Sequence, residues 1–222
     1  MKSSKAIITP EGYPFIAFTT GLFLLLAVGT VLYSSTALGL AALITLLLCL
    51  FTISFFRNPE RTPPADTSLL IAPADGTVVY VGPSQLEYMG ECQKISIFMS
   101  VFNVHVNRAP VTGRVIDHFY KQGKFYDARH KKASTENEQC GLVMEADNGL
   151  KVAFVQIAGL IARRILCYAK VGDQLQRGER YGLIRFGSRV DVYIPPGLKV
   201  LVSMGQTTVA GQTAIAQMVA AK

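Results

Sequence analysis

Residues 181–195 read YGLIRFGSRVDVYIP and place a Gly-Ser pair, Gly187-Ser188, between two apolar runs. The runs, Tyr181–Phe186 and Val190–Ile194, have the short, alternating character of β-strands. A Gly-Ser pair taken alone predicts only a turn. Here it stands 35 residues from the C-terminus of a 222-residue chain that also carries a long uncharged segment. This combination indicates a peptide bond that the protein cuts in itself to make a reactive carbonyl.

The residues around this stretch predict a mainly β domain. Apolar residues alternate or occur in short blocks, and Gly, Pro, Asn or Asp separates many of the blocks. The other predicted strands are Thr77–Val81, Lys94–Met99, Val111–Phe119, Leu142–Ala146, Lys151–Ile157, Leu166–Ala169 and Lys199–Val202. Many short strands with turns at close spacing favour a β-sandwich or barrel, mainly antiparallel, in a chain that is α+β overall.

Three local patterns refine this picture. Asp147-Asn148-Gly149-Leu150 is the clearest hairpin, and only Leu160–Arg164 indicates a short helix in this domain. The turn at residues 172–178, GDQLQRG, is typical of lipoyl-like β-domains. Such domains modify a lysine at a hairpin tip, and the chain has no Asp-Lys-Ala or Met-Lys-Met sequence that would supply it. We therefore expect lipoyl-like β-hairpin elements without a carrier function.

The uncharged segment predicts a membrane anchor. Residues 12–56 contain no Asp, Glu, Lys or Arg, which is about twice the length of roughly 20 residues that one crossing needs. The polar cluster Tyr33-Ser34-Ser35-Thr36 divides it into Tyr13–Leu32 and Ala37–Phe56. We expect a helical hairpin, transmembrane or re-entrant, in a membrane domain 1–60, followed by a catalytic domain 61–222 that opens with a short linker, residues 61–66. A cleaved signal peptide is disfavoured, because its apolar region spans only about 7–15 residues.

Charge places the second domain on the cytoplasmic face of the cell membrane. Lys2 and Lys5 precede the hairpin, Arg57 and Arg61 follow it, and the turn carries no charge. The chain has a net charge of +7, and 20 of its 22 basic residues lie beyond position 56. This excess fits an anionic lipid surface, and no basic motif interleaved with aromatic residues points to nucleic acid.

The cysteines predict neither a disulfide framework nor a metal site. Cys49, Cys92, Cys140 and Cys167 form no CxxC pair, so we expect free thiols in a reducing compartment.

A serine after glycine can attack the preceding carbonyl when the peptide is strained and a base takes its proton. The ester that forms can lose its acyl group by β-elimination, and the remaining dehydroalanine hydrolyses to a pyruvoyl group and ammonia. A pyruvoyl ketone condenses with a primary amine and accepts the electron pair of a carbanion, as pyridoxal phosphate does.

Four motifs in this order resemble phosphatidylserine decarboxylase of the short prokaryotic type. They are Ala72-Pro73-Ala74-Asp75-Gly76, residues 104–110 (VHVNRAP), residues 133–138 (ASTENE) and residues 186–191 (FGSRVD). The resemblance covers about residues 55–214. It implies cleavage at Gly187-Ser188 into a β chain, 1–187, and an α chain, 188–222, that form a heterodimer. It also implies conversion of phosphatidylserine in the bilayer to phosphatidylethanolamine through a Schiff base with the pyruvoyl group derived from Ser188, without a metal.

The chain departs from the longer members of the family at two places. Those members have Leu-Gly-Ser-Thr where this chain has Phe-Gly-Ser-Arg, which leaves the reacting pair intact. They also have a Tyr-His-Arg-Val-His element, of which Phe102-Asn103-Val104-His105 keeps only the second histidine. The role of the first histidine cannot be carried over.

The resemblance suggests roles for three residues. Ser188 is the nucleophile of maturation and then the source of the prosthetic group. His105 would take the Ser188 proton and later handle the proton at the substrate carbon, while Asp75 would orient the imidazole. Without the resemblance, Asp75-Gly76 would be read as a turn, and His105 equally well as a hydrogen-bonded core residue.

Other basic and titratable residues have weaker assignments. Arg108 and Arg114 are candidates for the substrate phosphate, and His118 and His130 are assigned structural or surface roles. The run at residues 129–132, RHKK, is most simply a solvated loop that attracts anionic headgroups.

Two alternative functions remain on sequence grounds. The same chemistry could act on another serine-headed lipid, such as archaetidylserine. The chain could also be a membrane-tethered, lipoyl-like binding module without catalysis.

The predicted orientation can be tested with membrane vesicles. A protease added to inverted vesicles should degrade the domain formed by residues 61–222, whereas right-side-out vesicles should protect it, because the domain faces the cytoplasm. Protection in the inverted vesicles would contradict the orientation.

Overall fold

The computed structural model describes residues 6–130, 132–160, 164–185 and 188–218. The chain divides into two compact units, residues 4–60 and residues 61–222. The first is helical and the second is mainly β.

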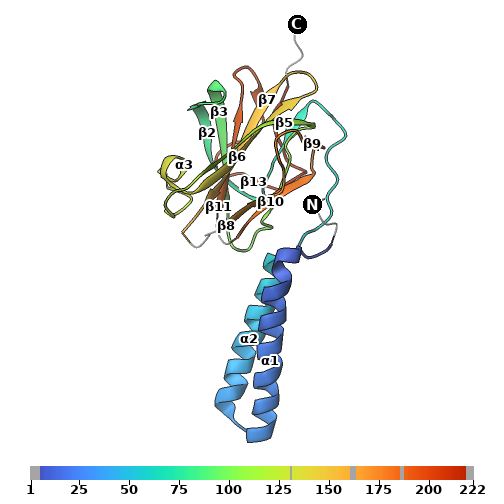
Figure 1. Ribbon diagram of the computed structural model, residues 1–222, viewed down its shortest axis with the longest axis vertical. Coiled ribbons are helices and arrows are strands. Elements are labelled where there is room, and N and C mark those ends of the chain that lie inside the picture. Colours follow the sequence, from blue (N-terminus) through green and yellow to red (C-terminus); the bar gives the residue numbers. More distant parts are fainter. Residues whose placement is uncertain (1–5, 131, 161–163, 186–187, 219–222) are drawn as a thin grey trace. The chain divides into compact units, whose positions relative to one another are not determined.

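The helical unit is the predicted hairpin. A short 3-10 helix, η1 (Pro10–Gly12), leads into α1 (Tyr13–Tyr33), and α2 (Thr36–Phe55) returns antiparallel to it (Figure 1). Ser34 adopts a left-handed conformation with φ 47°, and the Ser35 hydroxyl accepts a hydrogen bond from the Leu38 N–H at 3.4 Å. The turn therefore ends one helix and caps the next within two residues.

Both helices have the length and composition of membrane spans. At about 1.5 Å per residue, 20 residues extend about 30 Å, the thickness of a bilayer core. The side chains of Thr20 and Cys49 meet between the helices at 3.2 Å. Threonine hydroxyls elsewhere donate to carbonyls one turn earlier, as Thr45 does to Ala41 at 2.8 Å, so these polar groups need no water.

In the described part of the second unit, one short helix lies among the strands. In chain order its elements are β1 (Leu69–Ile71), β2 (Gly76–Leu86), β3 (Gly90–Met99), β4 (Val106–Arg108), β5 (Gly113–Lys121), α3 (Ala133–Glu136), β6 (Gln139–Ala146), β7 (Lys151–Ala158), β8 (Arg164–Cys167), β9 (Gln174–Leu175), β10 (Arg180–Arg185), β11 (Ser188–Ile194), β12 (Lys199–Val200), β13 (Thr207–Thr208) and β14 (Ala214–Gln217).

The strands form one large curled sheet and two small sheets (Figure 1). The large sheet has the order β13-β2-β3-β11-β7-β6-β5-β9, and the small sheets are β4-β10-β8 and β1-β14-β12. All of these strand pairs are antiparallel. The main core lies on the face of the large sheet that carries Val190 and Val192, where it meets Tyr181 and Ile184 of β10.

The sequence predicted the long strands well and the short ones poorly. The mainly β class is confirmed, and the 147–150 turn joins β6 to β7 as expected, with Gly149 at φ +79°. β1, β4, β9, β13 and β14 were not predicted, because two to four residues show no period. The expected helix at Leu160–Arg164 falls mostly outside the described residues, and Arg164 itself begins β8.

Candidate functional site

Ser188 lies at one end of the large sheet, between two neighbouring strands. It is the first residue of β11 and pairs with Met99 at the end of β3 and with Ala158 at the end of β7. Its side chain is completely buried, and its hydroxyl has no hydrogen-bond partner among the described residues. Because side chains alternate along a strand, Ser188 faces the same side as Val190 and Val192, toward the main core. Gly187 lies outside the described residues.

His105 stands beside the strand that leads toward Ser188. It precedes β4, and its carbonyl accepts a hydrogen bond from the Ile184 N–H in β10 at 3.4 Å. The imidazole is fully buried, and its Nδ1 lies 3.0 Å from the Asn103 carbonyl oxygen. A carbonyl only accepts, so Nδ1 carries a proton, and in the neutral ring Nε2 holds the lone pair. His105 is thereby held in the tautomer that a base needs.

Asp75 does not orient this imidazole as predicted. Its carboxylate accepts hydrogen bonds from both terminal nitrogens of Arg61, one of them at 2.8 Å, and from the Ala210 N–H at 2.8 Å. The Asn103 carbonyl takes the position expected of Asp75 at His105 Nδ1. Asp75 binds Arg61 instead of His105 because a guanidinium holds a carboxylate through two parallel hydrogen bonds, which an imidazole cannot match.

Gly76, the second residue of the Asp75-Gly76 motif, is required by the close packing of β2 against β3. A Cβ atom at this position would lie 2.0 Å from the Phe98 carbonyl oxygen on the neighbouring strand β3. Only glycine allows β2 to approach β3 so closely at the end of the sheet that holds Ser188.

Asn137, a residue of the ASTENE motif, supports the strand beside Ser188. It is fully buried and donates to the Ala158 carbonyl at 2.7 Å and to the Tyr126 carbonyl at 2.8 Å, while its own oxygen accepts from the Tyr126 N–H. Because Ala158 pairs with Ser188, Asn137 fixes the end of β7 at the site. The ASTENE motif marks Asn137 in the sequence, but the sequence alone could not predict its hydrogen bonds to Ala158 and Tyr126.

The opposite face of β11 carries a buried ion pair. Arg189 Nε lies 2.8 Å from an Asp191 carboxylate oxygen, and both side chains are almost completely buried. Ser134 donates to Asp191 at 2.9 Å and accepts from Arg189. A second Arg189 nitrogen donates to the Ala128 carbonyl at 2.7 Å. The arginine of the Phe-Gly-Ser-Arg variant is therefore a structural residue that joins β11 to the loop before α3.

Neither predicted phosphate ligand lies in a suitable place. Arg108 is buried and donates to the Gly178 carbonyl at 2.9 Å. Arg114 is exposed, but it pairs with Glu145, which faces Lys151 at the start of β7, whereas Ser188 pairs with the last residue of that strand. Seven residues of strand separate the two positions, roughly 23 Å.

Two other arginines lie where β10 ends, shortly before Ser188 in the sequence. Arg164 and Arg185 are directly opposite each other in β8 and β10, and Arg185 is the last described residue before Ser188. Arg164 is exposed and Arg185 is partly buried. The pair places two positively charged residues side by side where β10 ends, shortly before Ser188. Sequence reasoning missed the pair because their proximity depends on strand register.

In the basic run at residues 129–132, the charge of Arg129 is neutralised by a neighbouring carboxylate. Arg129 pairs with Asp127 at 2.6 Å, and hydrogen bonds from Arg129 lower the pKa of Asp127 to about 2. Lys131 lies outside the described residues.

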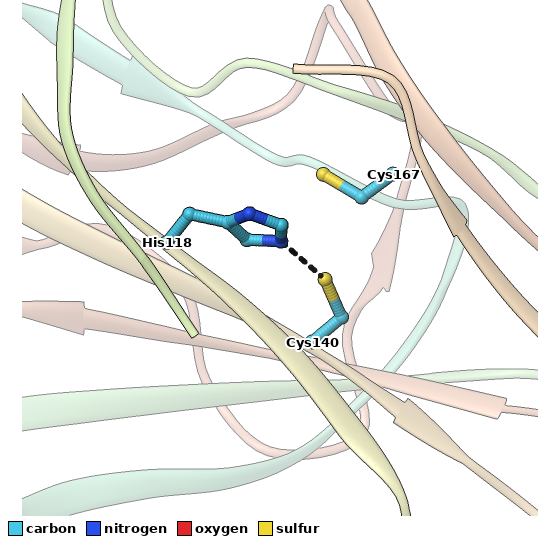
Figure 2. Close-up of side chains that lie close together, drawn as sticks. All are labelled: His118, Cys140 and Cys167. Carbon is cyan, nitrogen blue, oxygen red and sulfur yellow. Dashed lines mark hydrogen bonds between the residues drawn. The ribbon is translucent and has the colours of Figure 1, made fainter. Parts of the chain in front are cut away.

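One group of side chains in the described part of the chain could hold a metal ion. His118, Cys140 and Cys167 point toward one another from three strands, although their spacing in the sequence gave no sign of it (Figure 2).

Comparison with known proteins identifies a single family. The family model for phosphatidylserine decarboxylase matches residues 48–216. The chain is 74% identical to a phosphatidylserine decarboxylase proenzyme of Trichlorobacter lovleyi over 98% of its length and 100% of the relative's. It is 58% identical to the proenzyme of Geobacter metallireducens, over 96% of this chain and 97% of that one.

The Arg61–Asp75 pair should contribute to stability rather than to proton transfer. Breaking a buried pair by Asp75→Ala or Arg61→Ala should lower the free energy of unfolding by about 3–5 kcal/mol each, because the remaining charge is left unpaired. The double variant should lose less than the sum. Denaturant unfolding of the full chain in detergent measures these values.

Asp147→Ala, which removes an exposed carboxylate, is the control and should change stability by no more than about 0.5 kcal/mol. Normal stability of the Asp75→Ala protein combined with failed self-cleavage would restore the orienting role for Asp75.

Proposed function

Because the chain belongs to the phosphatidylserine decarboxylase family, we propose that it converts phosphatidylserine to phosphatidylethanolamine after cutting itself between Gly187 and Ser188. The relatives' names include the word proenzyme, which fits a chain that matures by cleavage. The observation that carries the proposal is the buried Ser188 hydroxyl, which has no hydrogen-bond partner among the described residues. An unpaired buried hydroxyl is costly, and such groups occur where chemistry requires them.

Maturation requires only residues of the chain and one water molecule. His105 Nε2 takes the Ser188 proton, the Ser188 oxygen attacks the Gly187 carbonyl carbon, and the peptide C–N bond is exchanged for an ester. Loss of the Ser188 α-proton then breaks the Cβ–O bond, which releases Gly187 as a carboxylate and leaves dehydroalanine. Water adds to the corresponding imine and ammonia leaves, so that the new chain begins with a pyruvoyl group.

The buried end of the sheet suits this group. Once formed, the pyruvoyl ketone would bind the substrate amine and accept the electron pair released with CO₂. His105, held by Asn103, would deliver a proton to the substrate carbon afterwards. Burial of Ser188 and His105 keeps water from competing with that proton transfer.

We assign the substrate phosphate to Arg164 and Arg185 in place of Arg108 and Arg114. Guanidinium groups bind phosphate through paired, charge-assisted hydrogen bonds, and these two are neighbours where β10 ends, shortly before Ser188. The apolar helices would keep the domain at the bilayer that holds its substrate, because a phospholipid does not readily leave the bilayer. On the charge pattern of the sequence, the domain works on the cytoplasmic face.

Ser188→Ala should abolish both cleavage and activity, because alanine has no oxygen to form the ester. Mass spectrometry should find one intact chain of 24.1 kDa, whereas the unaltered protein should give two fragments, the smaller blocked at its N-terminus. Ser203→Ala removes an exposed hydroxyl of the same segment and should be processed normally. An active Ser188→Ala protein, or a free serine at the start of the smaller fragment, would refute the proposal.

Arg164→Gln should raise KM for phosphatidylserine about tenfold, since a charge-assisted hydrogen bond contributes about 1.5–3 kcal/mol. Self-cleavage should remain normal, because Arg164 takes no part in the proposed attack of Ser188 on Gly187. Arg114→Gln, an equivalent change at the far end of the sheet, should leave KM unaltered. Equal KM values for the two variants in mixed micelles would remove Arg164 from the phosphate site.

A further inference from the structure

His118, Cys140 and Cys167 come together from three strands that are distant in the sequence. They belong to β5, β6 and β8, and their ligand atoms all lie within 4.8 Å of one another. His118 Nε2 is 3.2 Å from the Cys140 sulfur, and Figure 2 shows the imidazole and both sulfurs directed at a common space. We propose that these three side chains form a binding site for a zinc ion.

The spacing fits the dimensions of a tetrahedral zinc site. Zinc binds sulfur at about 2.3 Å and imidazole nitrogen at about 2.0–2.1 Å, so two ligand atoms on one ion lie roughly 3.5–3.8 Å apart. The observed distance of 3.2 Å and the upper bound of 4.8 Å bracket these values. Changes of up to about 1 Å in the distances between ligand atoms would complete the geometry.

The donor set selects the kind of metal. Two thiolates and one imidazole are soft to borderline ligands, which favour zinc and disfavour magnesium, calcium and manganese. Cys140 is buried and Cys167 half-buried, whereas His118 is exposed. The site is therefore shielded from bulk water but open on the histidine side, which provides an entry path for the ion.

Tyr181 supplies an independent observation. It is fully buried, and its hydroxyl has no hydrogen-bond partner among the described residues. It precedes Gly182, which pairs with Cys167, and its backbone carbonyl accepts a hydrogen bond from the Tyr168 N–H at 2.7 Å, so Tyr181 lies beside the strand that carries Cys167. A water molecule in the fourth position of the ion would give this hydroxyl a partner.

The ion would join the small sheet β4-β10-β8 to the large sheet. Cys167 belongs to the small sheet β4-β10-β8, and the other two ligands belong to the large sheet. β10, the neighbour of β8, ends at Arg185, two residues before the proposed cleavage site. Under the proposed function, zinc would hold the newly cut end of the larger chain against the large sheet. The site itself does not depend on cleavage.

Metal content tests the proposal directly. Full-length protein in detergent is reduced, stripped with a chelator, dialysed against zinc and then against metal-free buffer, and assayed by mass spectrometry for metal. We expect about one zinc per chain, and the same for Cys92→Ser, which changes a buried cysteine outside the cluster. The double variant Cys140→Ser/Cys167→Ser should retain none. His118→Ala, a change at an exposed position that does not threaten folding, should weaken zinc binding at least tenfold.

Two further measurements separate the alternatives. Cobalt(II) in place of zinc should give thiolate-to-metal charge-transfer absorption in the unaltered protein and in Cys92→Ser, but not in the double variant. Ser188→Ala should bind zinc as the unaltered protein does, so failure of the proposed function would leave this result intact. Zinc uptake by the unaltered protein no greater than that of the double variant, or uptake of copper(I) with none of zinc, would overturn the proposal.

Discussion

The central constraint of this structure is the insertion of β11 between β3 and β7. Two neighbouring strands saturate the backbone of β11, and its first residue, Ser188, is thereby buried at the end of the sheet. A serine in a solvated Gly-Ser turn would find water as a partner, and its hydroxyl would be an ordinary surface group. Burial removes the water and leaves the hydroxyl with no partner among the described residues, which is the condition that self-cleavage requires.

The same arrangement explains how the protein would survive cleavage. The segment after Ser188 contributes β11 to the middle of the large sheet, β13 to its edge and β14 to a small sheet beside β1. The Asp75 carboxylate and the Ala74 carbonyl also accept hydrogen bonds from Ala210 and Thr208 of this segment. Loss of one peptide bond would leave all these contacts in place, so the two chains would stay associated without a disulfide.

Polar groups in the interior are paired where they support the site. Arg189 and Asp191 neutralise each other and share Ser134, while Asn137 fixes Ala158 beside Ser188. Burying such groups costs free energy, which these ion-pair and hydrogen-bond contacts offset. Ser188 and Tyr181 are different, because neither hydroxyl has a partner among the described residues. The first marks the proposed cleavage site, and the second belongs to β10, which pairs with the strand of Cys167.

The sequence by itself determined the helical hairpin, the long strands, the 147–150 turn and the family, because hydrophobic period and turn residues act locally and the motifs lie in a fixed order. Only the tertiary structure decided which charges meet. Asp75 binds Arg61 rather than His105, and Arg164 faces Arg185, because strand register and chain crossings bring distant residues together. The cysteines show this most clearly: the spacing of Cys140 and Cys167 predicts no metal site, yet three strands place them beside His118. A ligand set drawn from separate strands leaves no spacing pattern in the chain, since its geometry exists only after the sheets have packed.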